Sequence, residues 1–132
     1  MADAPQPTLK WIFFSMSGRI NREEYWWSIF ALMAGNFVVM YALFNGRIEI
    51  GPVGELLFTE SQSMSLLGIV AVGMYFSFTI SVKRLHDMGW PGLLAVMLMF
   101  PVIGFIAFFM LGLMNGEKGT NKYGLEPPRL RR

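Results

Sequence analysis

The residues best suited to chemistry stand between Lys83 and Trp90, where four ionisable side chains follow a long apolar run. His86 is the only histidine of the chain, and Asp87 follows it directly. A catalytic histidine needs a nucleophile within hydrogen-bond reach and a third group that orients its ring. Adjacent residues of a helix point about 100° apart, so Asp87 cannot easily orient His86. The spacing selects no serine as a nucleophile.

Metal and cofactor chemistry have little support in the sequence. The chain has no cysteine, and a lone histidine with scattered carboxylates lacks the further ligands of a metal site. The glycine-rich stretch 116–124 is not a phosphate-binding loop, because no strand precedes it and Lys118-Gly119-Thr120 has the wrong order. We therefore expect no metal and no cofactor, and we favour binding or assembly over catalysis.

A second group of cations precedes the first long apolar run and is expected to meet the first group at one membrane face. In one interpretation the arginines pair with Glu23, Glu24 or Asp87, and Lys83 pairs with Asp87 one helical turn away, which clamps two helix ends together. In the other, the cations and their aromatic neighbours bind an anionic phospholipid or another anion. The candidate binding residues are Arg19, Arg22, Glu24, Tyr25, Arg84, His86, Asp87, Trp90, Asn121 and Tyr123. The alternative function is a membrane enzyme or carrier that acts on a lipid or an anionic metabolite there.

The elements that must position these residues are apolar helices. Of 132 residues, 54% are hydrophobic and 15% are charged, against about 25% charged in ordinary soluble domains. A single domain of this size cannot bury so much apolar surface in a globule. A net charge of +2 does not favour nucleic-acid binding. We expect an all-α integral membrane protein in the lipid bilayer, a small bundle of three hydrophobic helical segments.

Three nearly uncharged runs define these segments. Residues 22–44 form the first predicted transmembrane helix, with Asn21 as N-cap, Glu24 completing a capping box, and an aromatic belt at 25–27. Residues 64–84 form the second, and Gly89 suits the residue just past its end. The third, 91–114, is either one helix kinked at Pro101 or a re-entrant hairpin that turns at Pro101–Gly104.

The remaining segments are expected to be short and polar or interfacial. Residues 1–8 form a flexible tail, 9–17 an interfacial segment, 45–63 a loop with at most a surface helical turn, and 115–132 a polar basic tail. Gly73, Ser77 and Ser81 recur every four positions, and such a stripe lets another helix pack closely. A homo-oligomer or a membrane-protein partner is therefore an option.

Charge predicts the orientation of the first two helices. The loop between them carries one cation, Arg47, so it should face away from the cytoplasm and leave the N-terminus inside. A third straight span would then place the basic tail outside, against this bias. A re-entrant third segment would keep every basic segment inside. Both arrangements stay open.

Three blocks of sequence carry a specific resemblance. They are Gly18-Arg19-Ile20-Asn21-Arg22-Glu23-Glu24-Tyr25-Trp26, then Arg84-Leu85-His86-Asp87 with Trp90, then Gly116-x-x-Gly119-x-Asn121-x-Tyr123-Gly124. In this order, with the Pro101–Gly104 step between them, they resemble the YhaH-like small bacterial inner-membrane proteins over residues 10–128. The members share a domain of unknown function. The resemblance implies a multi-pass inner-membrane location and no established activity.

Overall fold

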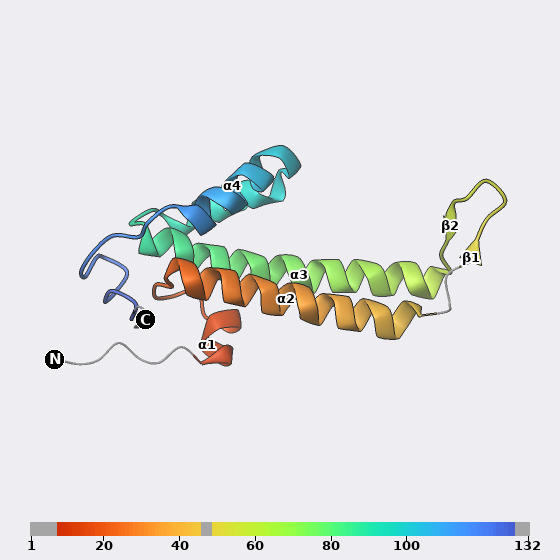
Figure 1. The fold of residues 1–132 in the computed structure, drawn as a ribbon, viewed down its shortest axis with the longest axis horizontal. Coiled ribbons are helices and arrows are strands. Elements are labelled where there is room, and N and C mark those ends of the chain that lie inside the picture. The colour runs from red at the N-terminus through yellow and green to blue at the C-terminus, as the bar shows by residue number, and fades with distance from the viewer. Residues whose placement is uncertain (1–7, 46–48, 129–132) are drawn as a thin grey trace.

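The computed structural model describes residues 8–45 and 49–128, and it is mostly helical (Figure 1). In chain order the elements are α1 (Leu9–Phe14), α2 (Arg22–Phe44), β1 (Glu49–Ile50), β2 (Leu56–Leu57), α3 (Glu60–Asp87), the 3₁₀ helix η1 (Gly92–Met99) and α4 (Pro101–Leu113). The predicted flexible tail up to Pro7, Arg47, and the last four residues of the predicted basic tail lie outside the described residues.

Helices α2 and α3 lie side by side and run in opposite directions (Figure 1). As the sequence predicts, the Asn21 side chain accepts from the Glu24 N–H, and the Glu24 carboxylate accepts from the Asn21 N–H. Helix α3 ends at Asp87, and Gly89, predicted as the residue just past its end, has φ +74°. There the Trp90 N–H donates to the Leu85 carbonyl and the Gly89 N–H to the His86 carbonyl, which is the Schellman pattern.

Both long helices have the length and composition of membrane-spanning helices. In the apolar 18-residue stretch of each helix, only 17% of the residues of α2 and 22% of those of α3 are buried inside the protein. The core helix of a soluble protein would be mostly buried. Their apolar side chains instead face outward along most of their length, as Phe37 (70% exposed) and Leu67 (65% exposed) do. The two helices are therefore candidate membrane spans.

The third apolar run is two helices that double back on each other, not one continuous helix. Phe100, between η1 and α4, has extended backbone angles, and Pro101 is the first residue of α4. A proline disfavours helix in the residue before it and suits the first position of a new helix. A Cβ added to Gly104 would lie 2.5 Å from the Leu98 carbonyl oxygen, so this glycine lets the two helices approach. Both ends of the pair lie near the end of α3 (Figure 1).

The expectation of a loop with a helical turn over residues 45–63 is wrong in two respects: this stretch contains a two-stranded ribbon, and α3 begins within it. Strands β1 and β2 form an antiparallel ribbon in which Glu49 pairs with Leu57 and Ile50 with Leu56. Helix α3 already begins at Glu60, because Thr59 and Gln62 form a second capping box. Thr59-Glu60-Ser61-Gln62 has the sequence pattern of that box, so the signal was present in the chain.

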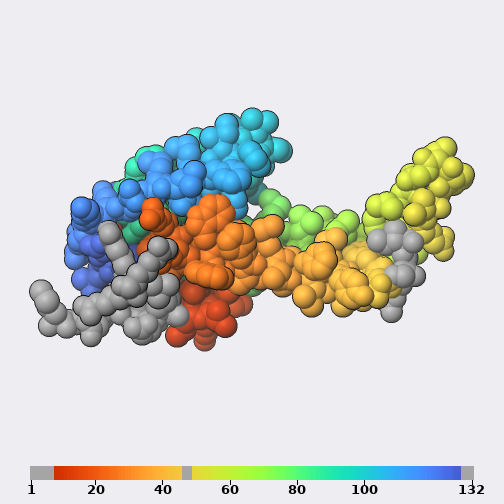
Figure 2. All heavy atoms as spheres, viewed as in Figure 1, coloured from red at the N-terminus to blue at the C-terminus, as the bar shows by residue number. Residues whose placement is uncertain are grey.

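The core sits at one end of the molecule, where α1, the start of α2, the end of α3 and the η1–α4 pair converge (Figure 1). Its buried apolar residues are Ile20, Tyr25, Ile29, Ile80, Val82, Leu85, Met88, Ala95 and Leu111. Figure 2 shows the β1–β2 hairpin standing apart at the opposite end. The polar residues singled out in the sequence belong to the packed end.

Candidate functional site

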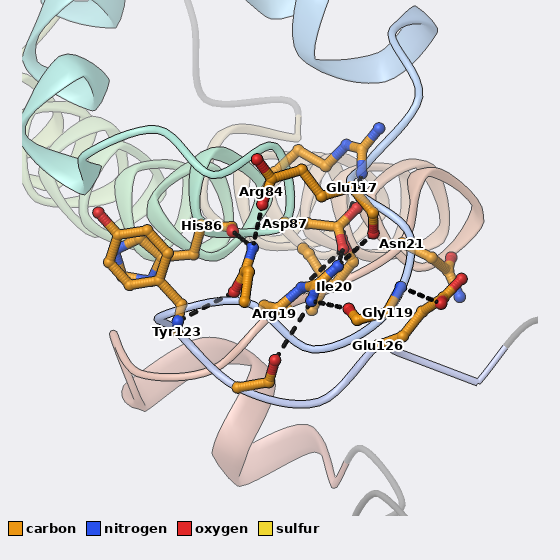
Figure 3. A network of polar contacts seen from close by, with 12 residues as sticks. Arg19, Ile20, Asn21, Arg84, His86, Asp87, Glu117, Gly119, Tyr123 and Glu126 are labelled. Atoms are coloured by element: carbon orange, nitrogen blue, oxygen red, sulfur yellow. Dashed lines mark hydrogen bonds and ion pairs between the residues drawn. The ribbon is translucent and has the colours of Figure 1, made fainter.

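The centre of the polar site is the buried carboxylate of Asp87, the last residue of α3. Arg19 donates from Nε to Asp87 Oδ1 at 3.1 Å, and its Nη2 lies 3.0 Å from the same oxygen. Arg84 donates from Nη1 to Asp87 Oδ2. All three residues are at least 95% buried. Figure 3 shows Arg19 and Arg84 converging on Asp87, and we call these three residues the clamp.

Arg84 also binds the end of α4. Its Nε donates to the Leu111 carbonyl at 2.8 Å, and its Nη2 donates to the Met114 carbonyl. The last carbonyls of a helix lack partners within the helix, and the negative end of the helix dipole favours a cation there. Arg84 therefore closes the η1–α4 pair onto the end of α3.

Arg19 binds the tail in the same manner. Its Nη1 donates to the carbonyls of Gly119 (2.6 Å) and Gly124 (3.2 Å), and its Nη2 donates to the Glu117 carbonyl (2.6 Å). The Glu117 N–H in turn donates to the Asp87 carbonyl at 2.8 Å. The tail thus folds onto the face where α2 begins and α3 ends.

Lys83 does not pair with Asp87, so that part of the sequence-based interpretation is wrong. Its ammonium group donates to the carbonyls of Trp11 (2.7 Å) and Ile12, and it lies 4.6 Å from the centre of the Trp11 ring. Spacing by four residues allowed the pair, but α1 packs against α3 and offers carbonyls in a site closed to solvent, where Lys83 is 0% exposed. Lys83 therefore holds α1.

His86 is built into the contact with the tail. Its ring stacks on Tyr123 with ring centres 3.9 Å apart and planes 9° apart. Its Nδ1 lies 3.3 Å from the Gly18 carbonyl oxygen, and Asn121 Nδ2 donates to the His86 carbonyl at 2.9 Å. His86 therefore contributes to the contact between the end of α3 and the tail. Figure 3 shows the stacked pair.

Four of the predicted site residues have other roles or positions. Tyr25 is 0% exposed and donates from its hydroxyl to the Phe108 carbonyl at 3.3 Å, so it packs α2 against α4. Glu24 caps its own helix. Trp90 is 40% exposed, and its backbone N–H donates to the Leu85 carbonyl. Arg22 is exposed and reaches Asn115 Oδ1 only at 3.5 Å.

A polar pocket of about 290 Å³ lies beside the clamp. Its walls come from the start of α2, the end of α3 and the tail, and the lining residues are Asn21, Arg22, Glu23, Arg84, Asp87, Asn115, Gly116, Glu117, Glu126 and Pro127. The described residues contain no group of three or more His, Cys, Asp or Glu side chains that could hold a metal ion. Arginine and carboxylates thus share one small pocket.

The sequence interpretation missed Gly116 and Glu117. A Cβ on Gly116 would collide with the Asp87 carboxylate, and Glu117 Oε2 accepts from Asn121 Nδ2 at 2.9 Å. Gly116, which opens the third sequence block, was the available signal, because a glycine is required where the backbone approaches a buried side chain closely.

The stripe of small residues faces inward. A Cβ on Gly73 would lie 3.3 Å from Asn36 Nδ2 of α2, which fits close packing within this chain. Gly73, Ser77 and Ser81 also line an apolar cavity of about 930 Å³ between α2, α3 and the η1–α4 pair. An oligomer through this stripe stays a prediction.

Comparison with known proteins identifies the family. The chain is 26% identical over 117 residues to the protein named inner membrane protein YhaI of Escherichia coli strain K12, covering 87% of each chain. It is 24% identical over 115 residues to inner membrane protein YhaH of the same strain, covering 87% of this chain and 88% of that one. No solved structure matches. A family described as "Protein of unknown function (DUF805)" matches residues 13–125, and the chain therefore belongs to that family, as the three sequence blocks predicted.

Proposed function

We propose that this chain is an inner-membrane protein that acts by binding or assembly. In this proposal α2 and α3 cross the bilayer, and η1 and α4 form a re-entrant hairpin in one leaflet. The relatives named as inner membrane proteins support the location, and the exposed apolar surfaces of α2 and α3 support the spans. Of the two alternatives for the third segment, its reversal at Phe100–Pro101 favours the hairpin.

Backbone pairing at the turn is compatible with a hairpin in lipid. Unpaired backbone groups are costly in the bilayer. The Phe100 N–H donates to the Met97 carbonyl at 3.2 Å, and the Phe100 carbonyl accepts from Gly104. Pro101 has no N–H to satisfy.

The distribution of cations supports a cytoplasmic location for both ends. Of the eleven Lys and Arg residues, only Arg47 lies between α2 and α3, which leaves ten on the other face if the third segment re-enters. This is the bias expected of the cytoplasmic side. In intact spheroplasts a membrane-impermeant maleimide should label a Glu55→Cys variant and not a Lys122→Cys variant. Labelling of Lys122→Cys from outside would refute the hairpin topology.

We further propose that the polar pocket holds a lipid headgroup through Arg22. Arg84, which also lines the pocket, already donates to the Leu111 carbonyl and to Asp87, whereas Arg22 is exposed with one long contact. It begins α2, about one helical turn before the aromatic belt of residues 25–27, and therefore lies at headgroup depth in this topology. An arginine there suits a phosphate.

The charges that line the pocket restrict the class of headgroup that it can bind. Glu23 and Glu117 line it together with Arg22, so a ligand with several negative charges would meet carboxylates. A headgroup that carries one phosphate and one ammonium group pairs with both signs. The proposed headgroup is therefore zwitterionic, such as phosphoethanolamine, rather than purely anionic.

The test is lipid retention. Protein purified in mild detergent should carry phosphatidylethanolamine, and Arg22→Gln should lose it, whereas Lys10→Gln, on the exposed side of α1, should keep it. Native mass spectrometry measures the bound lipid. Equal retention by both variants would refute the headgroup site, and a preference for phosphatidylglycerol would refute the zwitterionic assignment.

A further inference from the structure

The β1–β2 hairpin has two chemically different faces. Directly opposed residues of an antiparallel pair lie on the same face, and faces alternate along a strand. Ile50 and Leu56 therefore share one face, which Phe58 continues. Glu49 shares the other face with Leu57. A two-residue ladder thus separates an apolar face from a mixed face that carries one carboxylate, Glu49, and one leucine, Leu57.

The apolar face is open. Ile50 is 72% exposed, Leu56 56% and Phe58 39%, and Val53 at the tip is 89% exposed. The Glu55 carboxylate turns back to the tip, where its Oε2 accepts from the Val53 N–H at 3.1 Å. Isolated exposed apolar residues are ordinary, but a contiguous patch indicates a binding surface.

The attachment of the hairpin fixes what this face meets. Phe58 packs edge-to-face on Phe44, the last residue of α2, with ring centres 6.0 Å apart. Thr59 caps α3 immediately afterwards. Phe58 therefore joins the apolar face of the hairpin to the end of α2. The ribbon leaves the ends of the two long helices across the direction of the helix axes (Figure 1).

We propose that the β1–β2 hairpin is a membrane-surface anchor that lies in the headgroup region of the leaflet opposite the clamp. Ile50, Leu56 and Phe58 point toward the acyl chains, and Glu49 points to water. An apolar ribbon tied at both ends to two spans cannot move away from the bilayer, so lipid is the nearest apolar phase available to it. This inference rests on the membrane placement proposed above.

The absence of cysteine allows a direct measurement of depth. Single variants Ile50→Cys and Leu56→Cys carry a nitroxide on the apolar face, and Glu49→Cys carries one on the opposite face. Val70→Cys, on the outward side of α3, serves as the mid-span control. The protein is reconstituted in vesicles of phosphatidylethanolamine and phosphatidylglycerol. Collision with oxygen, which concentrates in lipid, is then compared with collision with a water-soluble nickel chelate.

The expected ratio of oxygen to nickel collisions is higher at positions 50 and 56 than at 49, and it lies between the values at 49 and 70. Equal, water-like ratios at 49, 50 and 56 would overturn the anchor. Low collision rates with both reagents at 50 and 56 would also overturn it, because they indicate a protein partner. A water-like ratio at 70 identifies failure of the membrane placement itself, whatever the hairpin reports.

Discussion

Replacing Asp87 by asparagine tests the clamp with little change of shape. The carboxylate contacts two arginines, and all three side chains are at least 95% buried. Removing one partner of a buried ion pair costs about 3 to 5 kcal/mol, because the remaining charge is uncompensated. Each arginine keeps carbonyl acceptors, from Leu111 and Met114 or from the tail. We therefore expect the lower end of the range, about 3 kcal/mol, or roughly a 100-fold change in the unfolding equilibrium.

The assay is unfolding in mixed micelles followed by tryptophan fluorescence. Glu23→Gln is the matched control, because Glu23 is a neighbouring acid without an ion pair to the clamp, and its loss should change stability by less than about 0.5 kcal/mol. Arg19→Gln, alone and combined with Asp87→Asn, completes a double-mutant cycle. A coupling of about 1 to 3 kcal/mol is expected for contacting charges in one network.

Two results would refute this reasoning. The first is an Asp87→Asn variant within about 1 kcal/mol of the unchanged protein, which is less than a buried pair requires. The second is additivity in the cycle, which would mean that Arg19 stabilises the tail through carbonyl hydrogen bonds without help from Asp87.

The other predictions follow from single contacts. Gly104→Ala should open the η1–α4 hairpin and lower thermal stability, because its Cβ would meet the Leu98 carbonyl; Gly35→Ala, with nothing within 4 Å, should be neutral or slightly stabilising in the same melting experiment. Lys83→Met should release α1, seen as faster tryptic cleavage at Lys10, since Trp11 and Ile12 lose their donor.

Local signals in the sequence were sufficient for the helix ends. The capping box at Asn21 and the glycine after α3 depend on residues within four positions of each other, and both form as predicted. The box at Thr59 has the same pattern and was readable as well. Helix ends that depend on a few neighbouring residues can therefore be predicted from the sequence alone.

Partners that come from distant segments could not be read from spacing. The prediction of a Lys83–Asp87 pair was wrong because a spacing of four shows only which side chains can meet on one helix. It gives no information about carbonyl groups that α1 or the tail brings to the same place. The third apolar run shows the same limit. Pro101 marks a break, but only the packing of Gly104 on Leu98 and the capture of α4 by Arg84 decide that the chain reverses there.

The clamp gives a physical reason for the three sequence blocks that resemble YhaH-like proteins. The first block supplies Arg19, and the second supplies Arg84 and Asp87. The third block supplies tail glycines that lie against Arg19 and Asp87. Each cation in this network, together with Lys83, binds the carbonyls of a segment that would otherwise be loose. A ligand that competed for Arg19 or Arg84 would have to displace those carbonyls and Asp87 from a buried site. Ligand binding that leaves the fold intact must therefore use a charge outside the network, and in the polar pocket Arg22 is the arginine that meets this condition.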